Sequence, residues 1–315
     1  MEIVTNFLLS VLTTAGLILS LLPNLCGLVT TYAPEQDDIL LNCAVVSDTH
    51  ADSNLFRDRT DTLRKAYAGI GESSRKIDVL LNIGDITNSG SKKDYRTQKR
   101  LEKAYIRPSH TVACFGNHDS WNGSADPHYD EAKRLYLQYI AGKGIDSKTV
   151  YYAAQIDGYY FICLGTESLD LHENLPTYSA EQLQWFDRML TEAEKTDLPV
   201  FVLSHLPITG RNGIGSSPLP QTVDEILQSH AGSGKPIFFF SGHCHDFTPA
   251  ILDSANNVYY INMPSTEYND QTEYVCNDNG GMGLAMEIYA DKVILKARNY
   301  ITDQWIDGYR FEITF

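Results

Sequence analysis

Short apolar runs that end in Asp, Asn or His constrain the fold of this 315-residue chain more than any other feature. Early in the chain, such runs cover residues 39–46, 77–83 and 111–115, and charged, helix-like segments cover residues 57–75 and 92–106. Apolar runs of this length are typical of strands buried on both faces. Strands that alternate with helices form parallel sheets through right-handed crossovers. This part of the chain therefore predicts a parallel α/β unit.

The rest of the chain adds more strands than helices. A hairpin is expected over residues 151–165, with its turn at Asp157-Gly158, and Ser179 should cap a helix over residues 179–194. Further strands are expected at residues 199–203, 236–240, 258–262, 283–289, 292–298 and 309–315, with a helix at 223–229. The fold class is thus α/β, with two mixed β-sheets packed as a sandwich and flanked by helices. No linker divides residues 39–315, which we expect to form one catalytic domain.

Potential metal ligands follow five of the predicted strands. Carboxylate oxygen and imidazole nitrogen are donors that suit zinc, iron and manganese. Parallel strands bring their carboxyl ends to one edge of a sheet, where sites form. In an extended segment, residues two apart also point to the same side, so a D-x-H or H-x-H pair could line one wall. The candidates are Asp48, His50, Asp85, Asn117, His205, His243 and His245.

Each of these pieces has a simpler explanation when it stands alone. Gly84-Asp85 after a strand is usually a turn. His205, before Leu-Pro, could be a core histidine with satisfied hydrogen bonds, and a single D-x-H pair often arises by chance. Five such blocks in order, each after an apolar run, favour a dinuclear metal site instead.

The five blocks resemble the calcineurin-like metallophosphoesterase superfamily, whose pattern is DxH, GD, GNH(D/E), H and GHxH. They read here Asp48-Thr49-His50, Gly84-Asp85, Gly116-Asn117-His118-Asp119, His205 and Gly242-His243-Cys244-His245. The resemblance implies a metallophosphoesterase fold and two divalent transition-metal ions, Mn, Fe or Zn. It implies that Asp48, His50 and His245 bind the first ion, that Asn117, His205 and His243 bind the second, and that Asp85 bridges them. It places His118 opposite the substrate phosphoryl group as the catalytic residue.

The segment around the second block resembles one branch of the superfamily more than the others. Gly84 to Gly90, with Tyr95 soon after, is similar in style to the class III cyclic nucleotide phosphodiesterases. Protein Ser/Thr phosphatases have an Asp at the position of Asn88, and purple acid phosphatases lack the histidine at position 50, so this chain departs from both.

The expected reaction is hydrolysis of phosphate esters, first of all phosphodiesters, by a hydroxide that bridges the two metal ions. Two such ions clamp the phosphoryl oxygens and lower the pKa of bound water to about 7. The alternatives are a phosphomonoesterase or protein phosphatase on the same site, or a metal-binding module without catalysis. Arg211 and Trp121 are candidate substrate-binding residues, since both lie near the ligand blocks in sequence.

The charge of the chain bears on its partners. Its formal net charge is −15, and no long Lys/Arg run offsets it. Nucleic-acid affinity depends mainly on cationic side chains that neutralise phosphates, so nucleic acid is not expected as a partner. A small phosphorylated substrate fits better, because bound metal ions reverse the local charge. The sequence leaves the oligomeric state open.

Residues 1–38 are expected to form an N-terminal hydrophobic segment and linker. Residues 7–22 are nearly all apolar or small, and Pro23 follows them. This segment is shorter than the about 20 residues of a membrane span and suits the apolar part of a signal peptide. We therefore expect export or membrane anchoring through residues 7–22. The alternative is an apolar helix packed on the body of a cytoplasmic protein.

Overall fold

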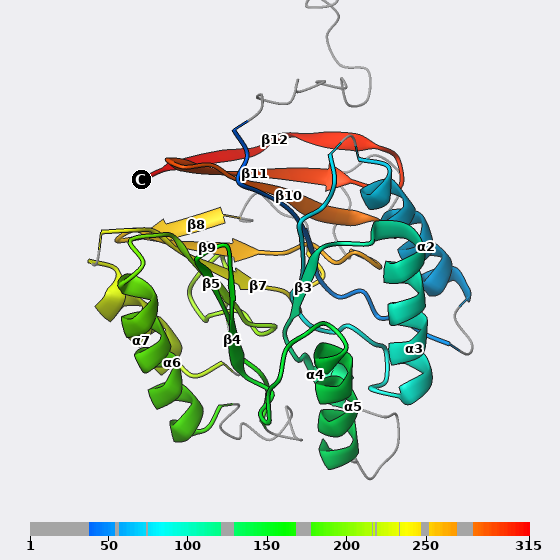
Figure 1. The fold of residues 1–315 in the computed structure, drawn as a ribbon, viewed down its shortest axis with the longest axis horizontal. Coiled ribbons are helices and arrows are strands. Elements are labelled where there is room, and N and C mark those ends of the chain that lie inside the picture. Colours follow the sequence, from blue (N-terminus) through cyan, green and yellow to red (C-terminus); the bar gives the residue numbers. More distant parts are fainter. Residues whose placement is uncertain are drawn as a thin grey trace, which may run out of the picture.

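The fold is a two-sheet sandwich with helices on both outer faces, as the sequence predicts (Figure 1). The computed structural model describes residues 38–53, 57–73, 75–120, 129–167, 178–215, 217, 219–232, 234–246, 252–269 and 280–315. Within these residues the chain forms two mixed sheets of six strands each. The predicted fold class is confirmed.

The first sheet has the strand order β12-β11-β10-β1-β2-β3. Its strands are β1 (Leu41–Val46), β2 (Val79–Asn82), β3 (His110–Ala113), β10 (Met282–Ile288), β11 (Lys292–Asn299) and β12 (Gln304–Thr314). Strands β1, β2 and β3 are parallel, whereas β10 pairs antiparallel with both β1 and β11. The expected parallel unit therefore shares one sheet with the antiparallel strands β10, β11 and β12.

The second sheet has the strand order β4-β5-β6-β7-β9-β8. Its strands are β4 (Tyr152–Ile156), β5 (Tyr159–Cys163), β6 (Val200–Leu203), β7 (Ile237–Ser241), β8 (Leu252–Ala255) and β9 (Val258–Asn262). Strands β4 and β5 form the predicted hairpin, and Asp157 adopts a φ of 48° in its turn. Strand β8 was not predicted, because its four residues include Asp and Ser and lie half-exposed at the sheet edge.

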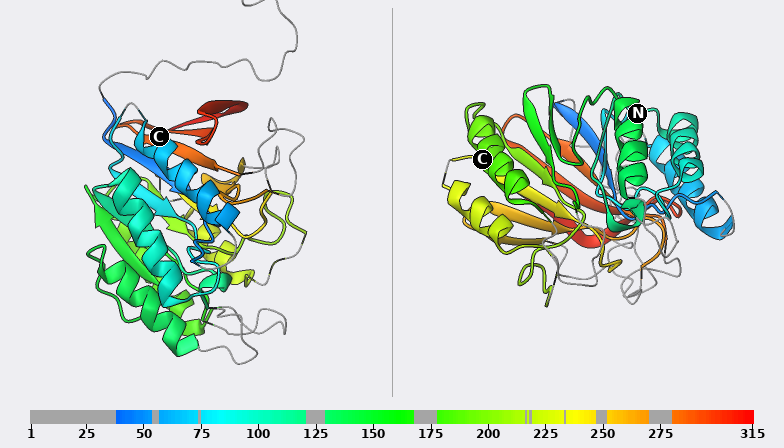
Figure 2. Two further views of the ribbon diagram at one scale, coloured as in Figure 1. Left: turned by 90° about the vertical axis from the view of Figure 1, so that its right-hand side faces the viewer. Right: turned by 90° about the horizontal axis from the view of Figure 1, so that it is seen from below.

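Helices cover the outer face of each sheet (Figure 2), whereas helix α5 (Tyr129–Ala141) packs against the apolar layer between the sheets. Their bounds are α2 (Arg57–Gly71), α3 (Lys92–Leu101), α4 (Asn117–Ser120), α5 (Tyr129–Ala141), α6 (Ala180–Glu194) and α7 (Thr222–His230), and a π-helix, η1 (Glu102–Ile106), continues α3. Helix α2 and η1 pack on the outer residues of β1 and β2, and α6 and α7 pack on β6 and β7. The cap predicted for α6 is confirmed, since Ser179 Oγ accepts a hydrogen bond from Gln182 N at 3.1 Å. Helix α5 was missed.

Continuous apolar runs follow from burial on both faces. In β6, Phe201 and Leu203 face the layer between the sheets, whereas Val200 and Val202 pack under α6 and α7. The ring of Phe201 stacks on Phe161 in β5, with centroids 5.1 Å apart. A buried Val, Leu or Phe contributes roughly 1.5–3 kcal/mol, so these strands hold the site's loops on a rigid base.

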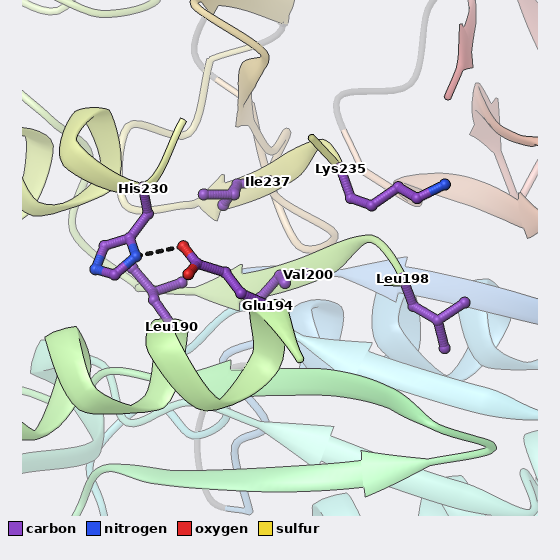
Figure 3. A pocket seen from close by; sticks show the side chains of 7 residues that line it. All are labelled: Leu190, Glu194, Leu198, Val200, His230, Lys235 and Ile237. Atoms are coloured by element: carbon purple, nitrogen blue, oxygen red, sulfur yellow. Dashed lines mark hydrogen bonds and ion pairs between the residues drawn. The ribbon is translucent and has the colours of Figure 1, made fainter. Parts of the chain in front are cut away.

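Helices α6 and α7 are also joined at the surface. Figure 3 shows His230 of α7 beside Glu194 of α6, at a small hollow above the strand ends of the second sheet. The ring nitrogens of His230 lie 2.5 Å from a carboxylate oxygen of Glu194 and 3.0 Å from one of Asp187. This contact is an ion pair whenever His230 is protonated.

The expectation of export or membrane anchoring through residues 7–22 is corrected. None of the helices in the described part of the chain combines the length and the apolar character that a membrane span needs. Residues 7–22 themselves lie outside the described residues.

Four of the six cysteines lie in the described part of the chain, and all four are free thiols: Cys43, Cys114, Cys163 and Cys244. Cys26 and Cys276 lie outside it.

Candidate dinuclear metal centre

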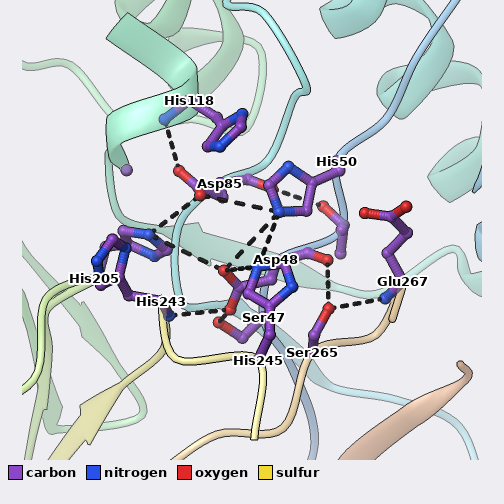
Figure 4. Close-up of polar contacts among 12 residues, drawn as sticks. Ser47, Asp48, His50, Asp85, His118, His205, His243, His245, Ser265 and Glu267 are labelled. Atoms are coloured by element: carbon purple, nitrogen blue, oxygen red, sulfur yellow. Dashed lines mark hydrogen bonds and ion pairs between the residues drawn. The ribbon is translucent and has the colours of Figure 1, made fainter. Parts of the chain in front are cut away.

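All the predicted metal ligands meet at one edge of the sandwich, and Figure 4 labels those other than Asn117. They lie on five loops, which follow β1, β2, β3, β6 and β7. These strands belong to both sheets, so the site spans the two carboxyl edges. The sequence predicts this location, because polar residues follow the end of each of these strands.

One group of ligands gathers around Asp48. His245 Nε2 lies 3.1 Å from Asp48 Oδ1 and 3.1 Å from His50 Nε2. Both residues of the D-x-H block thus reach the last histidine of the G-H-x-H block. This is the set that the family resemblance assigns to the first ion.

A second group gathers around Asn117, the first residue of α4. Its Oδ1 lies 3.0 Å from His205 Nε2 and 3.1 Å from His243 Nδ1. His205 Nδ1 lies 2.9 Å from the backbone oxygen of Ile83. A carbonyl only accepts hydrogen bonds, so this contact puts the hydrogen on Nδ1 and directs the Nε2 lone pair of the neutral ring toward the site.

Asp85 lies between the two groups. Its Oδ2 is 3.2 Å from His205 Nε2 and 3.8 Å from His50 Nε2. Its Oδ1 accepts a hydrogen bond from the backbone N of His118 at 2.8 Å. A carboxylate in this position can contact a cation on either side.

The donor atoms fit two cations. Lone pairs of oxygen and nitrogen face one another about 3 Å apart, which is repulsive unless a proton or a metal ion lies between them. Asp48 Oδ1 is buried, and its 3.1 Å contact with His245 Nε2 does not have the geometry of a hydrogen bond. Asp48, His50 and His245, and separately Asp48, Asp85 and His205, each bring three ligand atoms within 4.8 Å of one another. These are the residue types that manganese, iron and zinc bind.

The pKa shifts of the buried ligands also indicate that the site favours positive charge. Burial works against a charged His205, but Asp85 and Asp48 outweigh it and raise the pKa of His205 to about 10. Burial likewise works against a charged Asp85, but the neighbouring histidines, His205 first among them, together outweigh it and hold the pKa of Asp85 well below its usual range. The two buried carboxylates, Asp48 and Asp85, therefore keep their negative charge and need positive charge beside them, which either a protonated His205 or a metal ion can supply.

Five of the ligands have left-handed backbone conformations, which corrects the expected extended geometry. The φ angles are 50° at Asp48, 40° at His50, 47° at Asp85, 73° at His243 and 52° at His245. This conformation costs roughly 1–2 kcal/mol per residue for side chains other than glycine. Such strain persists where the surrounding structure imposes it, and it is concentrated at functional sites.

Two glycines of the motifs provide space for the carboxylates. A Cβ atom on Gly242 would overlap Ser47 Oγ and come 2.7 Å from Asp48 Oδ2. A Cβ atom on Gly116 would overlap the backbone N and the carboxylate of Asp85. The glycines of the G-N-H and G-H-x-H blocks thus permit close approach of backbone to ligand.

His118 is held next to the ligands through its backbone and its ring. Its Nδ1 lies 3.1 Å from the backbone oxygen of Asn88, so Nδ1 carries the hydrogen. Its ring packs edge-on against His50, with centroids 4.6 Å apart. His118 is thus contacted by the backbone carbonyl of Asn88, the residue at the position where protein phosphatases have an Asp.

Of the two candidate substrate residues, Arg211 lies in the described part of the chain, and its guanidinium contacts α7 and β9 rather than the metal ligands. Arg211 pairs with Asp224 of α7 at 2.8 Å, and its guanidinium lies 4.5 Å from the ring centroid of Tyr260. Trp121 lies outside the described residues. A substrate-binding role for either residue stays a prediction.

The structure adds residues that the sequence reasoning missed. Ser265 Oγ donates to the backbone oxygen of Asp48 at 3.2 Å and accepts from Glu267 N at 3.2 Å (Figure 4). These residues follow β9, as the ligand blocks follow their strands. A polar run after an apolar strand was therefore a signal for this loop as well.

Comparison with known proteins agrees with this geometry. Residues 41–247 match the family described as calcineurin-like phosphoesterase. The chain belongs to this family. Its reaction class, metal-dependent hydrolysis of phosphate esters, is therefore as the sequence predicts.

Two relatives bear the name manganese-dependent ADP-ribose/CDP-alcohol diphosphatase. The Xenopus tropicalis protein is 24% identical over 314 residues, covering 79% of this chain and 85% of that protein. The human protein is 26% identical over 140 residues, and the match covers 44% of this chain and only 37% of the human protein.

Solved structures share the fold. A dimetal phosphatase from Danio rerio superposes with a TM-score of 0.60 at 19% identity, covering 88% of this chain and 100% of that one. A purple acid phosphatase from yellow lupin seeds has a TM-score of 0.60 at 14% identity, covering 90% of this chain and 55% of that one.

Proposed function

We propose that residues 39–315 form a catalytic domain that uses two divalent transition-metal ions, manganese first among them, to cleave a diphosphate or phosphodiester linkage in a small substrate. The observation that carries the proposal is the convergence of two buried carboxylates, one amide and four imidazoles at one edge of the sandwich, where the carboxyl ends of strands from both sheets meet. The relatives named as manganese-dependent diphosphatases support both the metal and the substrate class. In the compounds that these names give, ADP-ribose and CDP-alcohols, each phosphorus carries one ester bond and is joined through a bridging oxygen to the second phosphorus.

Each ligand has a proposed place. Asp48, His50 and His245 hold one cation, and Asn117, His205 and His243 hold the other, with Asp85 shared. Bound cations of this kind act as Lewis acids on a phosphoryl oxygen and lower the pKa of water. The neutral amide of Asn117 leaves its cation more electrophilic than a carboxylate would.

His118 is the proposed proton donor to the leaving oxygen. The carbonyl of Asn88 accepts a hydrogen bond from Nδ1, so the proton given to the substrate comes from Nε2 of the protonated ring. General acids of this kind contribute about 10²–10⁴-fold in rate. The charge of the protonated ring would also favour an anionic substrate.

Hydrolysis assays with metal-stripped protein test the proposal. Mn²⁺, Fe²⁺ and Zn²⁺ are restored singly, and ADP-ribose, CDP-choline and matched 4-nitrophenyl mono- and diesters are supplied. We expect metal-dependent cleavage of the diphosphates and the diester, and none by Asp85→Asn. Cleavage of the monoester alone would replace the proposal with a phosphomonoesterase. Tight binding of two metals without any cleavage would point to a module without catalysis.

A further inference from the structure

We propose that Arg59 of α2 is a positioning residue for His118, acting through Asn88 and held in place by Glu267. The proposal rests on the proposed function, because it assigns a role in the same reaction. It adds a residue outside all five sequence blocks. Arg59 lies only two residues after the start of α2, between the loop that carries His118's partner and the loop that follows β9.

The contacts form a chain from Glu267 to His118. Arg59 Nε lies 2.7 Å from Glu267 Oε1, and an Arg59 terminal nitrogen donates to Asn88 Oδ1 at 2.9 Å. The backbone oxygen of Asn88 then accepts from His118 Nδ1 at 3.1 Å. A rigid guanidinium fork suits this task, since it offers donors in fixed directions to two acceptors.

Asn88 is fixed on three sides, so its carbonyl has a defined direction. Its backbone N donates to Ala51 O at 3.1 Å, and its Nδ2 donates to Asp52 Oδ2 at 3.1 Å. Arg59 supplies the third contact, at Oδ1. Without it, the amide loses the one partner that comes from a helix rather than from the loop after β1.

Glu267 links Arg59 to the other side of the metal centre. Its side chain is 6% exposed and that of Arg59 is 37% exposed, so this ion pair is partly shielded from water. Glu267 N donates to Ser265 Oγ, which in turn donates to the backbone oxygen of Asp48. Arg59 therefore bridges the loop bonded to a metal ligand and the loop bonded to His118.

A purely structural role for Arg59 makes different predictions from a positioning role. If Arg59 only stabilises α2, its loss lowers stability and affects all substrates alike. If it positions His118, its loss slows proton donation to the leaving group. Phosphodiesters whose leaving group is an aliphatic alcohol should then lose far more rate than 4-nitrophenyl esters or diphosphates, whose leaving groups depart as a stable phenolate or phosphate anion.

Kinetics of Arg59→Met in the metal-loaded protein test the inference. We expect kcat for a phosphodiester with an alkyl leaving group to fall about 10²-fold, because misplacing a catalytic group by about 1 Å costs this much. KM should change little, the metal content should stay at the wild-type value, and Glu267→Gln should show a smaller loss in the same direction. The matched control is Arg64→Met, on the same helix, where Arg64 pairs with exposed Asp61; it should keep wild-type kinetics.

A double-mutant cycle separates the two roles. Arg59→Met should have no further effect on kcat in a His118→Ala background, because the residue through which it acts is gone. An equal loss in both backgrounds, or an equal loss for 4-nitrophenyl and alkyl phosphodiesters, would overturn the inference.

A measurement without turnover keeps the inference independent of the proposed function. In zinc-loaded protein with ¹⁵N-labelled histidine, the His118 resonances, assigned by their absence in His118→Ala, should report hydrogen on Nδ1. Arg59→Met, or Glu267→Gln if the former does not fold, should shift or broaden these resonances, whereas Arg64→Met should not. Unchanged His118 resonances would refute the inference even if the enzyme is active. Absence of hydrolysis with shifted resonances would refute the proposed function alone.

Discussion

Replacing Asp119 by Ala should destabilise the loops that carry the metal ligands Asp85 and Asn117. Asp119 is fully buried, and its carboxylate accepts three backbone hydrogen bonds. The donors are Gly116 N at 3.0 Å, Ile86 N at 3.1 Å and Thr87 N at 3.0 Å. It therefore ties the residues that follow Asp85 to the loop that carries Asn117 and His118.

The cost follows from the number of backbone donors left without an acceptor. The hydroxyls of Thr87 and Tyr95 also donate to this carboxylate, but a hydroxyl can rotate to another acceptor, so they are left out of the count. A buried donor whose partner is removed costs about 1–3 kcal/mol. Three donors give about 3–9 kcal/mol, and water that enters the vacated space keeps the loss near the lower end, about 3–5 kcal/mol. A loss of this size is exceptional for a single substitution.

Urea denaturation of metal-free Asp119→Ala and wild-type protein, followed by circular dichroism, measures this loss. Asp61→Ala is the control, because Asp61 is 45% exposed and pairs only with its helix neighbours Arg64 and Lys65. Metal binding by Asp119→Ala should also weaken, since Asp85 and Asn117 lose their common support. A decrease in unfolding free energy below about 1 kcal/mol would refute the reasoning, because one unsatisfied donor alone should cost that much.

Three further predictions concern the metals and the helices. His118→Ala should keep both metals and lose about 10²–10⁴-fold in rate, whereas Asp85→Asn should lose the metal pair; elemental analysis beside turnover checks this, and retained metals in Asp85→Asn would contradict it. Gly242→Ala should bind the first metal more weakly, as its Cβ would overlap Ser47 Oγ beside Asp48, and calorimetric metal titration measures the change. Burial opposes protonation of His230, but two α6 carboxylates outweigh it and raise its pKa. Its contribution, below about 1 kcal/mol because the pair is half-exposed, should be present below about pH 6.5 and lost as the pH rises through the raised pKa. Melting temperatures of wild type and His230→Gln across this range should converge at high pH.

Local signals explain most of the fold that could be read from the sequence. Apolar runs marked the strands of both sheets except β8, and Ser179 marked the start of α6. Helix α5 also carried a readable signal, since its buried positions Ala132, Leu135, Tyr136, Tyr139 and Ile140 recur at helical spacing. The π-helical end of α3 carried no such signal, because its residues suit an ordinary helix equally well.

The sequence by itself determined which donors exist, their order and the strand ends that carry them, because these depend on neighbouring residues. Only the tertiary structure decided which atoms face each other. Asn117 meets His205 and His243 across 88 and 126 residues of chain, and Arg59 meets Glu267, which lies far from it in sequence. The left-handed turns at the ligands arise in the same way. Such contacts depend on strand pairing and core packing summed over the whole molecule, and no short stretch of sequence contains that sum.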